Sequence, residues 1–524
     1  MRTIHLVRPT AAMSRALLVA AIWSVSALCW CQQAPQVAQI QQLLAADQLD
    51  EALAASQEWA HREPADPLAL LTMARLQVEA GQFEAALDSL DAAYFLTRDP
   101  EALVQKGLVY LQWGRTPEAE AAMQEALQHS DSCAGAHAGL ARVYLEQRRP
   151  MEARAAALAA LGVDPNHGGA RVVLARLDIA DGNLAKAAEV LGGTASPAPQ
   201  GAETALWLGN VLALQGRPEE ARPHWRHFVE ASPGDSDAWL LAHGLHPLQL
   251  GPYACPGAYP TFSPDGRRVA FRGNADPGSV YLAPADRPES YERLYEGDGT
   301  VYSLEWSPDG SRLACREYAK ADVTGKQQLR YAIVVLTVDR PRETARAYEG
   351  SYAGECCFSP DGNEIWFDGY VPGKGRGMLA ATLTGGEPRV VLLPQRYETF
   401  IGCRFSPADG RLLAQRWWQE SREYQLLFLD QTDRHRDQLV AHTRQKLQFP
   451  VFTPDGSHLL YFMRTGGGLW DLVAQCVLAG SRPRPLLRGL RNLAPVAFAD
   501  QGQQMVVADA SGEYHLYRLL GLRP

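Results

Sequence analysis

The chain has 524 residues, 46% of them hydrophobic, and a formal net charge of −9, which excludes a disordered chain and indicates at least two domains. The acidic excess is confined to residues 33–245, with 15 Lys and Arg against 28 Asp and Glu, whereas residues 246–524 carry 32 against 31. This distribution argues against nucleic acid as a partner, because binding to it requires clustered basic charge, and it favours a basic or mixed protein partner.

Residues 1–31 are predicted to be an export signal. Three arginines precede an apolar run from Ala16 to Leu28, which suits a signal peptide and is short for a membrane-spanning helix. Cys29 and Cys31 follow this run, as the lipidated cysteine does in a bacterial lipoprotein. That signal has a small residue directly before the cysteine, whereas Leu28 and Trp30 stand there in this sequence. We therefore expect an exported, periplasmic or envelope-associated protein, with a lipoprotein or a membrane-anchored form as alternatives. A cytoplasmic adaptor, anchored and facing inward, is a further alternative.

Residues 33–245 are rich in alanine and repeat at a constant interval. A small residue, which lets two helices cross closely, stands twelve positions before the marker alanine in five repeats. A proline that stops a helix follows twelve positions after it in three repeats. This pattern predicts six pairs of helices and resembles the tetratricopeptide-repeat (TPR) family. The marker alanines, spaced by 34, 33, 34, 34 and 34 residues, are Ala52, Ala86, Ala119, Ala153, Ala187 and Ala221.

The TPR resemblance implies a curved array whose concave groove holds a peptide or the surface of another protein. The residue after each small residue is predicted to face this groove. Arginines there could bind carboxylates of a partner, and the alternative is that they pair with the many local Asp and Glu residues. The five predicted groove residues are Arg75, Leu108, Arg142, Arg176 and Asn210.

Residues 246–524 contain six near-copies of one short phrase, an aromatic residue followed by Ser-Pro-Asp-Gly, at intervals of 44 to 52 residues. Proline presets the backbone for a tight turn, Asp forms local hydrogen bonds, and Gly accepts a positive φ. We therefore interpret the phrase as a structural turn and not as a ligand site. Its aromatic residues are Phe262, Trp306, Phe358, Phe405, Phe452 and Phe498.

Each phrase is followed by strand patterns that predict a four-stranded antiparallel unit, so the region is expected to be a six-bladed β-propeller. The sixth unit lacks an outer strand before the chain ends, and residues 246–250 resemble that strand. We expect them to complete the last blade and close the ring. The phrases resemble the TolB-like propeller family, which implies partner binding in the bacterial cell envelope.

Binding residues of the propeller are predicted on the loops between the second and third strands, at the end opposite the repeated turns. These loops interleave aromatic and basic residues, as interface hot spots do. The alternative for Trp417 and Trp470 is packing beneath their own loops. The predicted rim residues are Tyr318, Tyr370, Arg376, Trp417, Trp418, Arg464 and Trp470.

The sequence contains no catalytic motif of the common hydrolase, zinc-protease, EF-hand or dinucleotide-binding types, and seven scattered cysteines have no metal-ligand spacing. A disulfide between Cys356 and Cys403, at equivalent positions of two blades, is considered. We predict no metal and no cofactor, and expect a non-enzymatic scaffold whose helical groove binds one protein and whose propeller binds a second protein or, alternatively, an envelope polymer. The alternative is a glycan-binding protein or a carbohydrate-active enzyme that uses the propeller channel.

Overall fold

The computed structural model describes residues 35–521 except 47, 193–199, 233–234, 324–325, 341–342, 431–433, 466–467, 478–480, 492, 500–501 and 509–512. The predicted export signal, with Cys29 and Cys31, lies outside the described residues. The chain divides into two compact units, Met1–Gln249 with Leu520–Pro524, and Leu250–Leu519. No helix of the described residues is long and apolar enough to cross a membrane.

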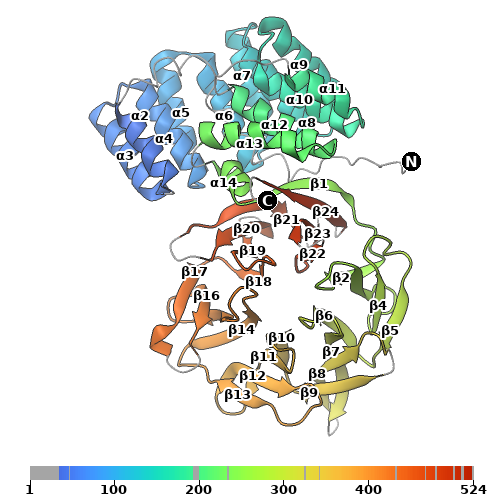
Figure 1. The fold of residues 1–524 in the computed structure, drawn as a ribbon. Helices are drawn as coiled ribbons and strands as arrows, with labels where there is room; N and C mark the ends of the chain where they lie inside the picture. The colour runs from blue at the N-terminus through green and yellow to red at the C-terminus, as the bar shows by residue number, and fades with distance from the viewer. Residues whose placement is uncertain are drawn as a thin grey trace. The chain divides into compact units, whose positions relative to one another are not determined.

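The first unit is helical, and consecutive helices pair as the sequence predicts (Figure 1). The helices are α2 (Pro35–Ala45), α3 (Leu49–Arg62), α4 (Pro67–Glu79), α5 (Phe83–Thr97), α6 (Pro100–Trp113), α7 (Thr116–His129), α8 (Ala134–Glu146), α9 (Pro150–Val163), α10 (Gly168–Ala180), α11 (Leu184–Gly192), α12 (Gln200–Leu214), α13 (Pro218–Ala231) and α14 (Ser236–Ala242).

Small residues hold the two helices of each pair together. All six marker alanines are fully buried. A Cβ added to Gly107 of α6 would lie 2.7 Å from Met123 Cε of α7, and one added to Gly209 of α12 would lie 2.4 Å from Trp225 Nε1 of α13. Both distances are shorter than ordinary carbon contacts, so even an alanine would force Met123 or Trp225 to shift, and only a small residue fits at these crossings. The predicted role of the small residues is thus confirmed.

The second unit is a ring of six antiparallel four-stranded sheets (Figure 1). The strands are β1 (His246–Pro252), β2 (Gly257–Phe262), β3 (Arg268–Gly273), β4 (Ser279–Pro284), β5 (Glu292–Glu296), β6 (Thr300–Trp306), β7 (Arg312–Val323), β8 (Lys326–Thr337), β9 (Thr344–Gly350), β10 (Ala353–Phe358), β11 (Glu364–Val371), β12 (Gly375–Thr382), β13 (Arg389–Leu392), β14 (Glu398–Phe405), β15 (Leu412–Trp418), β16 (Glu423–Leu429), β17 (Gln438–Thr443), β18 (Leu447–Phe452), β19 (His458–Arg464), β20 (Trp470–Cys476), β21 (Arg484–Leu490), β22 (Ala497–Ala499), β23 (Gln504–Ala508) and β24 (Tyr514–Leu520).

The sixth sheet closes the ring as predicted. Its strand order is β1-β24-β23-β22, so β1 supplies the outer strand that the end of the chain lacks. Directly after β1, the amide of Tyr253 donates to the carbonyl of Tyr514 (2.7 Å). The pairing covers an edge of β24 that would otherwise expose a row of unpaired backbone groups.

The aromatic residues of the first five repeated phrases pack against a neighbouring blade. Trp306 Nε1 donates to the carbonyl of Thr261 in the first blade (3.1 Å), and the Phe428 and Phe452 rings of the fourth and fifth blades stack with centroids 6.2 Å apart. Strands β2, β6, β10, β14, β18 and β22 are innermost and surround the centre of the ring (Figure 1).

Candidate functional site

The repeated turns occupy one end of the propeller and satisfy their own polar groups. In the second blade, Ser307 Oγ donates to Asp309 Oδ1 (2.6 Å) and accepts from the amide of Arg312 (2.9 Å), while Gly310 has a φ of 69°. The hydrogen bond from Ser307 lowers the pKa of Asp309 to about 2. These contacts account for the motif as turn chemistry.

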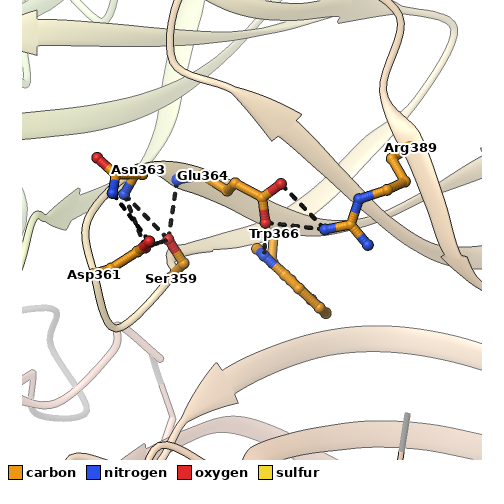
Figure 2. A network of polar contacts seen from close by, with 6 residues as sticks. All are labelled: Ser359, Asp361, Asn363, Glu364, Trp366 and Arg389. Carbon is orange, nitrogen blue, oxygen red and sulfur yellow. Dashed lines mark hydrogen bonds and ion pairs between the residues drawn. The ribbon is translucent and has the colours of Figure 1, made fainter. Parts of the chain in front are cut away.

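The third blade shows how one turn connects to the strand that follows (Figure 2). Ser359 Oγ donates to Asp361 (2.5 Å) and accepts from the amide of Glu364 (2.9 Å). The Glu364 carboxylate then accepts from Trp366 Nε1 (3.0 Å) and forms an ion pair with Arg389 of β13 (3.0 Å). Asp361 and Glu364 are therefore held by neighbours in their own blade.

A cavity of about 620 Å³ runs along the innermost strands, and charged side chains converge in it. Arg404 Nη2 lies 3.9 Å from Glu305 and 3.6 Å from Glu355, and Arg404 Nη1 donates to the carbonyl of Cys356 (3.0 Å). Burial raises the pKa of Glu305, against the effect of Arg404. Burial acts to lower the pKa of Arg404, but the two glutamates raise it overall. Sequence reasoning named none of these three residues.

The predicted rim residues lie on four blades and differ in exposure. Tyr370 is 49% exposed, and Arg464 is also exposed. Trp470 is buried. Trp417 is half-buried against Tyr424, with 4.5 Å between the ring centroids. Trp418 is half-buried below Arg416, whose guanidinium carbon lies 5.1 Å from the Trp418 ring centroid. Binding of a partner by these residues stays a prediction.

Tyr318 and Arg376, the remaining two predicted rim residues, belong to a larger group. Tyr318 contacts the ring of Tyr331, its cross-strand partner on β8 (5.9 Å between centroids). Arg376 lies over the Tyr352 ring, 4.3 Å from its centroid, and forms an ion pair with Asp368 of β11. Burial raises the pKa of Asp368 to about 6, against the effect of Arg376.

Sequence reasoning missed the other members of this group because it searched only the loops between second and third strands. Tyr259, Tyr302 and Tyr352 stand three, four and six residues before the aromatic residue of their own phrase. A tyrosine repeated near that position in three successive blades was the available signal.

In the helical unit, all five predicted groove residues are buried, with at most 9% of each residue exposed. Arg142 of α8 forms an ion pair with Glu203 of α12, and Arg176 Nη2 lies 3.8 Å from Glu146. Arg176 also lies over the Trp207 ring, 5.4 Å from its centroid. These contacts match the alternative of pairing with local acidic residues, and partner binding by this row stays a prediction.

The disulfide considered between Cys356 and Cys403 is not formed, and both residues are free cysteines. Cys357 Sγ, not Cys356, faces Cys403 Sγ at 3.7 Å, and both thiols are buried. The reason is that successive side chains of a strand point to opposite faces, so Cys356 packs in the cluster with Ile333. Across the described ranges, no group of three or more His, Cys, Asp or Glu residues could hold a metal ion.

Tetratricopeptide-repeat models match residues 71–137, 138–202 and 202–227. The helical unit is a TPR array. No curated protein matches the chain by sequence. The TPR assignment agrees with the buried marker alanines and the glycine crossings, which explain the repeat in physical terms.

Solved structures resemble each part of the chain at low identity. TolB from Acinetobacter baumannii is 16% identical over 56% of this chain and 71% of TolB, with a TM-score of 0.37. An oligogalacturonate lyase from Vibrio parahaemolyticus is 10% identical over 50% and 76%, with a TM-score of 0.39. A thermophilic TPR protein from Thermus thermophilus is 19% identical over 33% and 96%, with a TM-score of 0.28. The strand order shows a six-bladed propeller after the TPR array, and TolB structures are among its structural neighbours.

Proposed function

We propose that the protein is a non-enzymatic adaptor of the bacterial cell envelope. Its TPR array binds one protein, and its propeller binds a second protein or an envelope polymer. The observation that carries this proposal is the presence of two independent repeat arrays in one chain. TPR and propeller folds generally offer extended surfaces for protein interaction. The apolar run before residue 31 supports the location in the envelope.

On the TPR array, the second helices offer side chains to a partner. Met151 and Leu158 stand seven residues apart on α9, hence on one helical face, and are 76% and 54% exposed. Phe95 at the end of α5 is 69% exposed. Large apolar side chains in such positions lose unfavourable contact with water when a partner covers them.

Site-specific photocrosslinking in intact cells tests the adaptor function. A photoreactive residue would replace Met151 in the TPR array or Tyr370 on the propeller rim, with Asp361 in a repeated turn as the control position. We expect a different covalent protein adduct from each of the first two positions, recovered in the envelope fraction, and none from the control. Absence of adducts at both positions would contradict the proposal, and recovery in the cytosol would contradict the envelope location.

The second candidate function, a carbohydrate-active enzyme, is favoured by the two channel glutamates. Glu305 has a raised pKa, as a general acid requires, and Glu355 lies near the same arginine. The ion pairs with Arg404 favour a structural role instead. Release of reducing ends from a polysaccharide by the purified protein, lost in Glu305→Gln, would overturn the non-enzymatic part of the proposal.

A further inference from the structure

Five tyrosine rings form a continuous row across the first three blades. Neighbouring ring centroids are 5.9, 6.0, 5.9 and 5.3 Å apart, and Tyr302 is 43% exposed, while the other four are half-buried. Each ring combines an apolar face with a polar hydroxyl. The tyrosine row consists, in order, of Tyr259, Tyr302, Tyr318, Tyr331 and Tyr352.

Three arginines are fixed against this row by cation–π contacts. The guanidinium carbons of Arg272, Arg316 and Arg376 lie 5.0, 4.9 and 4.3 Å from the ring centroids of the first, second and fifth tyrosines. The Nε atom of each arginine is buried and has no hydrogen-bond partner. The guanidinium groups are therefore held in place with hydrogen-bonding capacity left unused.

Two of these arginines lie outside the ion pairs of the described residues. Arg376 pairs with Asp368, but Arg272 and Arg316 form no ion pair with any described residue. Arg272 Nη1 lies 3.4 Å from the carbonyl of Val301, and Arg316 Nη1 lies 3.5 Å from that of Ala353, at the long end of hydrogen bonding. The first two blades thus present two arginines outside ion pairs beside the tyrosine row. The charge of Arg316 also acts on Asp368, where it opposes the rise in pKa that burial causes.

The row borders the channel cavity, which gives a ligand room to be enclosed. Tyr259, Tyr302 and Arg316 line the cavity of about 620 Å³, together with Ser303. Ser303 Oγ is buried and has no hydrogen-bond partner in the described residues. An aromatic surface, the Arg316 guanidinium and the buried Ser303 hydroxyl therefore meet at the cavity wall, which Glu305, Glu355 and Arg404 also line. Arg272 lies against Tyr259, outside this lining.

We propose that this site binds an acidic oligosaccharide of the uronic-acid class. Carboxylates of the sugar accept hydrogen bonds from Arg272 and Arg316, which suit planar anions. The C–H face of a sugar ring packs on Tyr302, the exposed ring of the row. A sugar is favoured over an acidic peptide because the row alternates flat aromatic faces with polar hydroxyl and guanidinium groups, which match the C–H faces and the polar substituents of a sugar. The site does not rest on the adaptor function proposed above.

Calorimetric titration of the full-length protein tests the site. The probes are a uronic-acid tetrasaccharide, a neutral tetrasaccharide of the same length, and a tetraglutamate peptide. We expect the acidic sugar to bind, with affinity falling as salt is added, and the neutral sugar to bind at least about tenfold more weakly. Arg316→Gln and Tyr302→Ala should each weaken binding of the acidic sugar by about tenfold or more.

Matched controls come from the same propeller. Tyr291 is 48% exposed, and Arg293 pairs with Glu296; neither belongs to the row. Tyr291→Ala and Arg293→Gln should change affinity by less than about twofold. Arg316→Lys retains the charge without the planar fork and should also weaken binding, which keeps the test valid if the glutamine variant misfolds.

Three results would overturn the proposal. They are no binding of the acidic sugar, equal affinity for the neutral sugar, and binding that Arg316→Gln and Tyr302→Ala leave unchanged. Tighter binding of tetraglutamate with the same sensitivity to both variants would also overturn it, because the site would then recognise an acidic peptide.

Discussion

The two ends of the propeller differ in how much their residues vary from blade to blade. At the turn end, Ser307, Ser359 and Thr453 make the same contacts in three different blades, each donating to the aspartate two residues later. At the rim end, one strand position varies between blades. It lies three residues beyond the residue that pairs with the phrase aromatic, and it is arginine in the first two blades and a different residue in each of the next three. From the first blade to the fifth it is Arg272, Arg316, Asp368, Gln415 and Phe462.

This difference separates side chains that stabilise the fold from those available for function. A residue repeated in each blade satisfies a requirement that each blade has, such as ending a strand and turning. A residue that differs between blades is free of that requirement, and it can even lower stability, as a buried carboxylate does. The search for a ligand site therefore belongs at the rim, where the tyrosine row and its arginines lie.

The largest expected effect concerns Asp368, which is fully buried at the rim. Its folded-state pKa is about 6, above the ordinary value of 3.8, so the folded protein holds this proton more tightly than the unfolded chain. The stabilising contribution of this carboxyl is present below about pH 4 and lost as pH rises to about 6. Relative to Asp368→Asn, the wild type should lose at most about 3 kcal/mol across this window, measured by urea denaturation at several pH values.

Asp309 at the turn end supplies the matched control with the opposite sign. Its pKa is lowered to about 2, so its contribution to stability is present above about pH 4 and lost as pH falls to about 2. Relative to Asp309→Asn, the wild type should become less stable on acidification. If both aspartates gave the same sign, the proposed contrast between the two ends would be wrong.

Most of the fold could be predicted because repetition reveals it. Marker alanines such as Ala119 recur at the TPR period, and the phrase around Trp306 recurs in each blade, so spacing alone counted the units. The lack of a last outer strand also predicted that β1 would close the ring, which the strand order confirms. Repeats can be recognised in a sequence because every unit needs the same residue types at the same packing positions.

The candidate sites were less predictable because they depend on contacts between distant segments. The sequence placed Arg142 beside a groove, but it could not show that Glu203, 61 residues away, lies against it. It likewise identified Tyr318 and Arg376 without Tyr302 and Tyr352, which come from other strands. The geometry of the ring decides which side chains of neighbouring blades come into contact, and no local sequence pattern records it.

The second prediction concerns the turn hydroxyls. Ser307→Ala removes the hydrogen bond to Asp309 and the acceptor for the amide of Arg312, so the free energy of unfolding should fall by about 1 to 2 kcal/mol. Ser359→Ala should cost a similar amount, because its contacts are the same. Ser311→Ala is the control, since this exposed hydroxyl bonds the same aspartate (2.7 Å) and should cost less than about 0.5 kcal/mol. Unequal losses at Ser307 and Ser359 would contradict a shared role.

The smallest effect is expected at the rim surface. Tyr370 is 49% exposed, and its strand position pairs with Arg376 across β11 and β12. Tyr370→Ala should therefore change the free energy of unfolding by no more than about 0.5 kcal/mol, because little apolar surface is buried there and the backbone pairing remains. Urea denaturation of this variant beside Ser307→Ala makes the comparison direct. A loss as large as that of the turn serine would mean that the rim stabilises the blade as the turns do, and that variation between blades does not mark a surface free for binding.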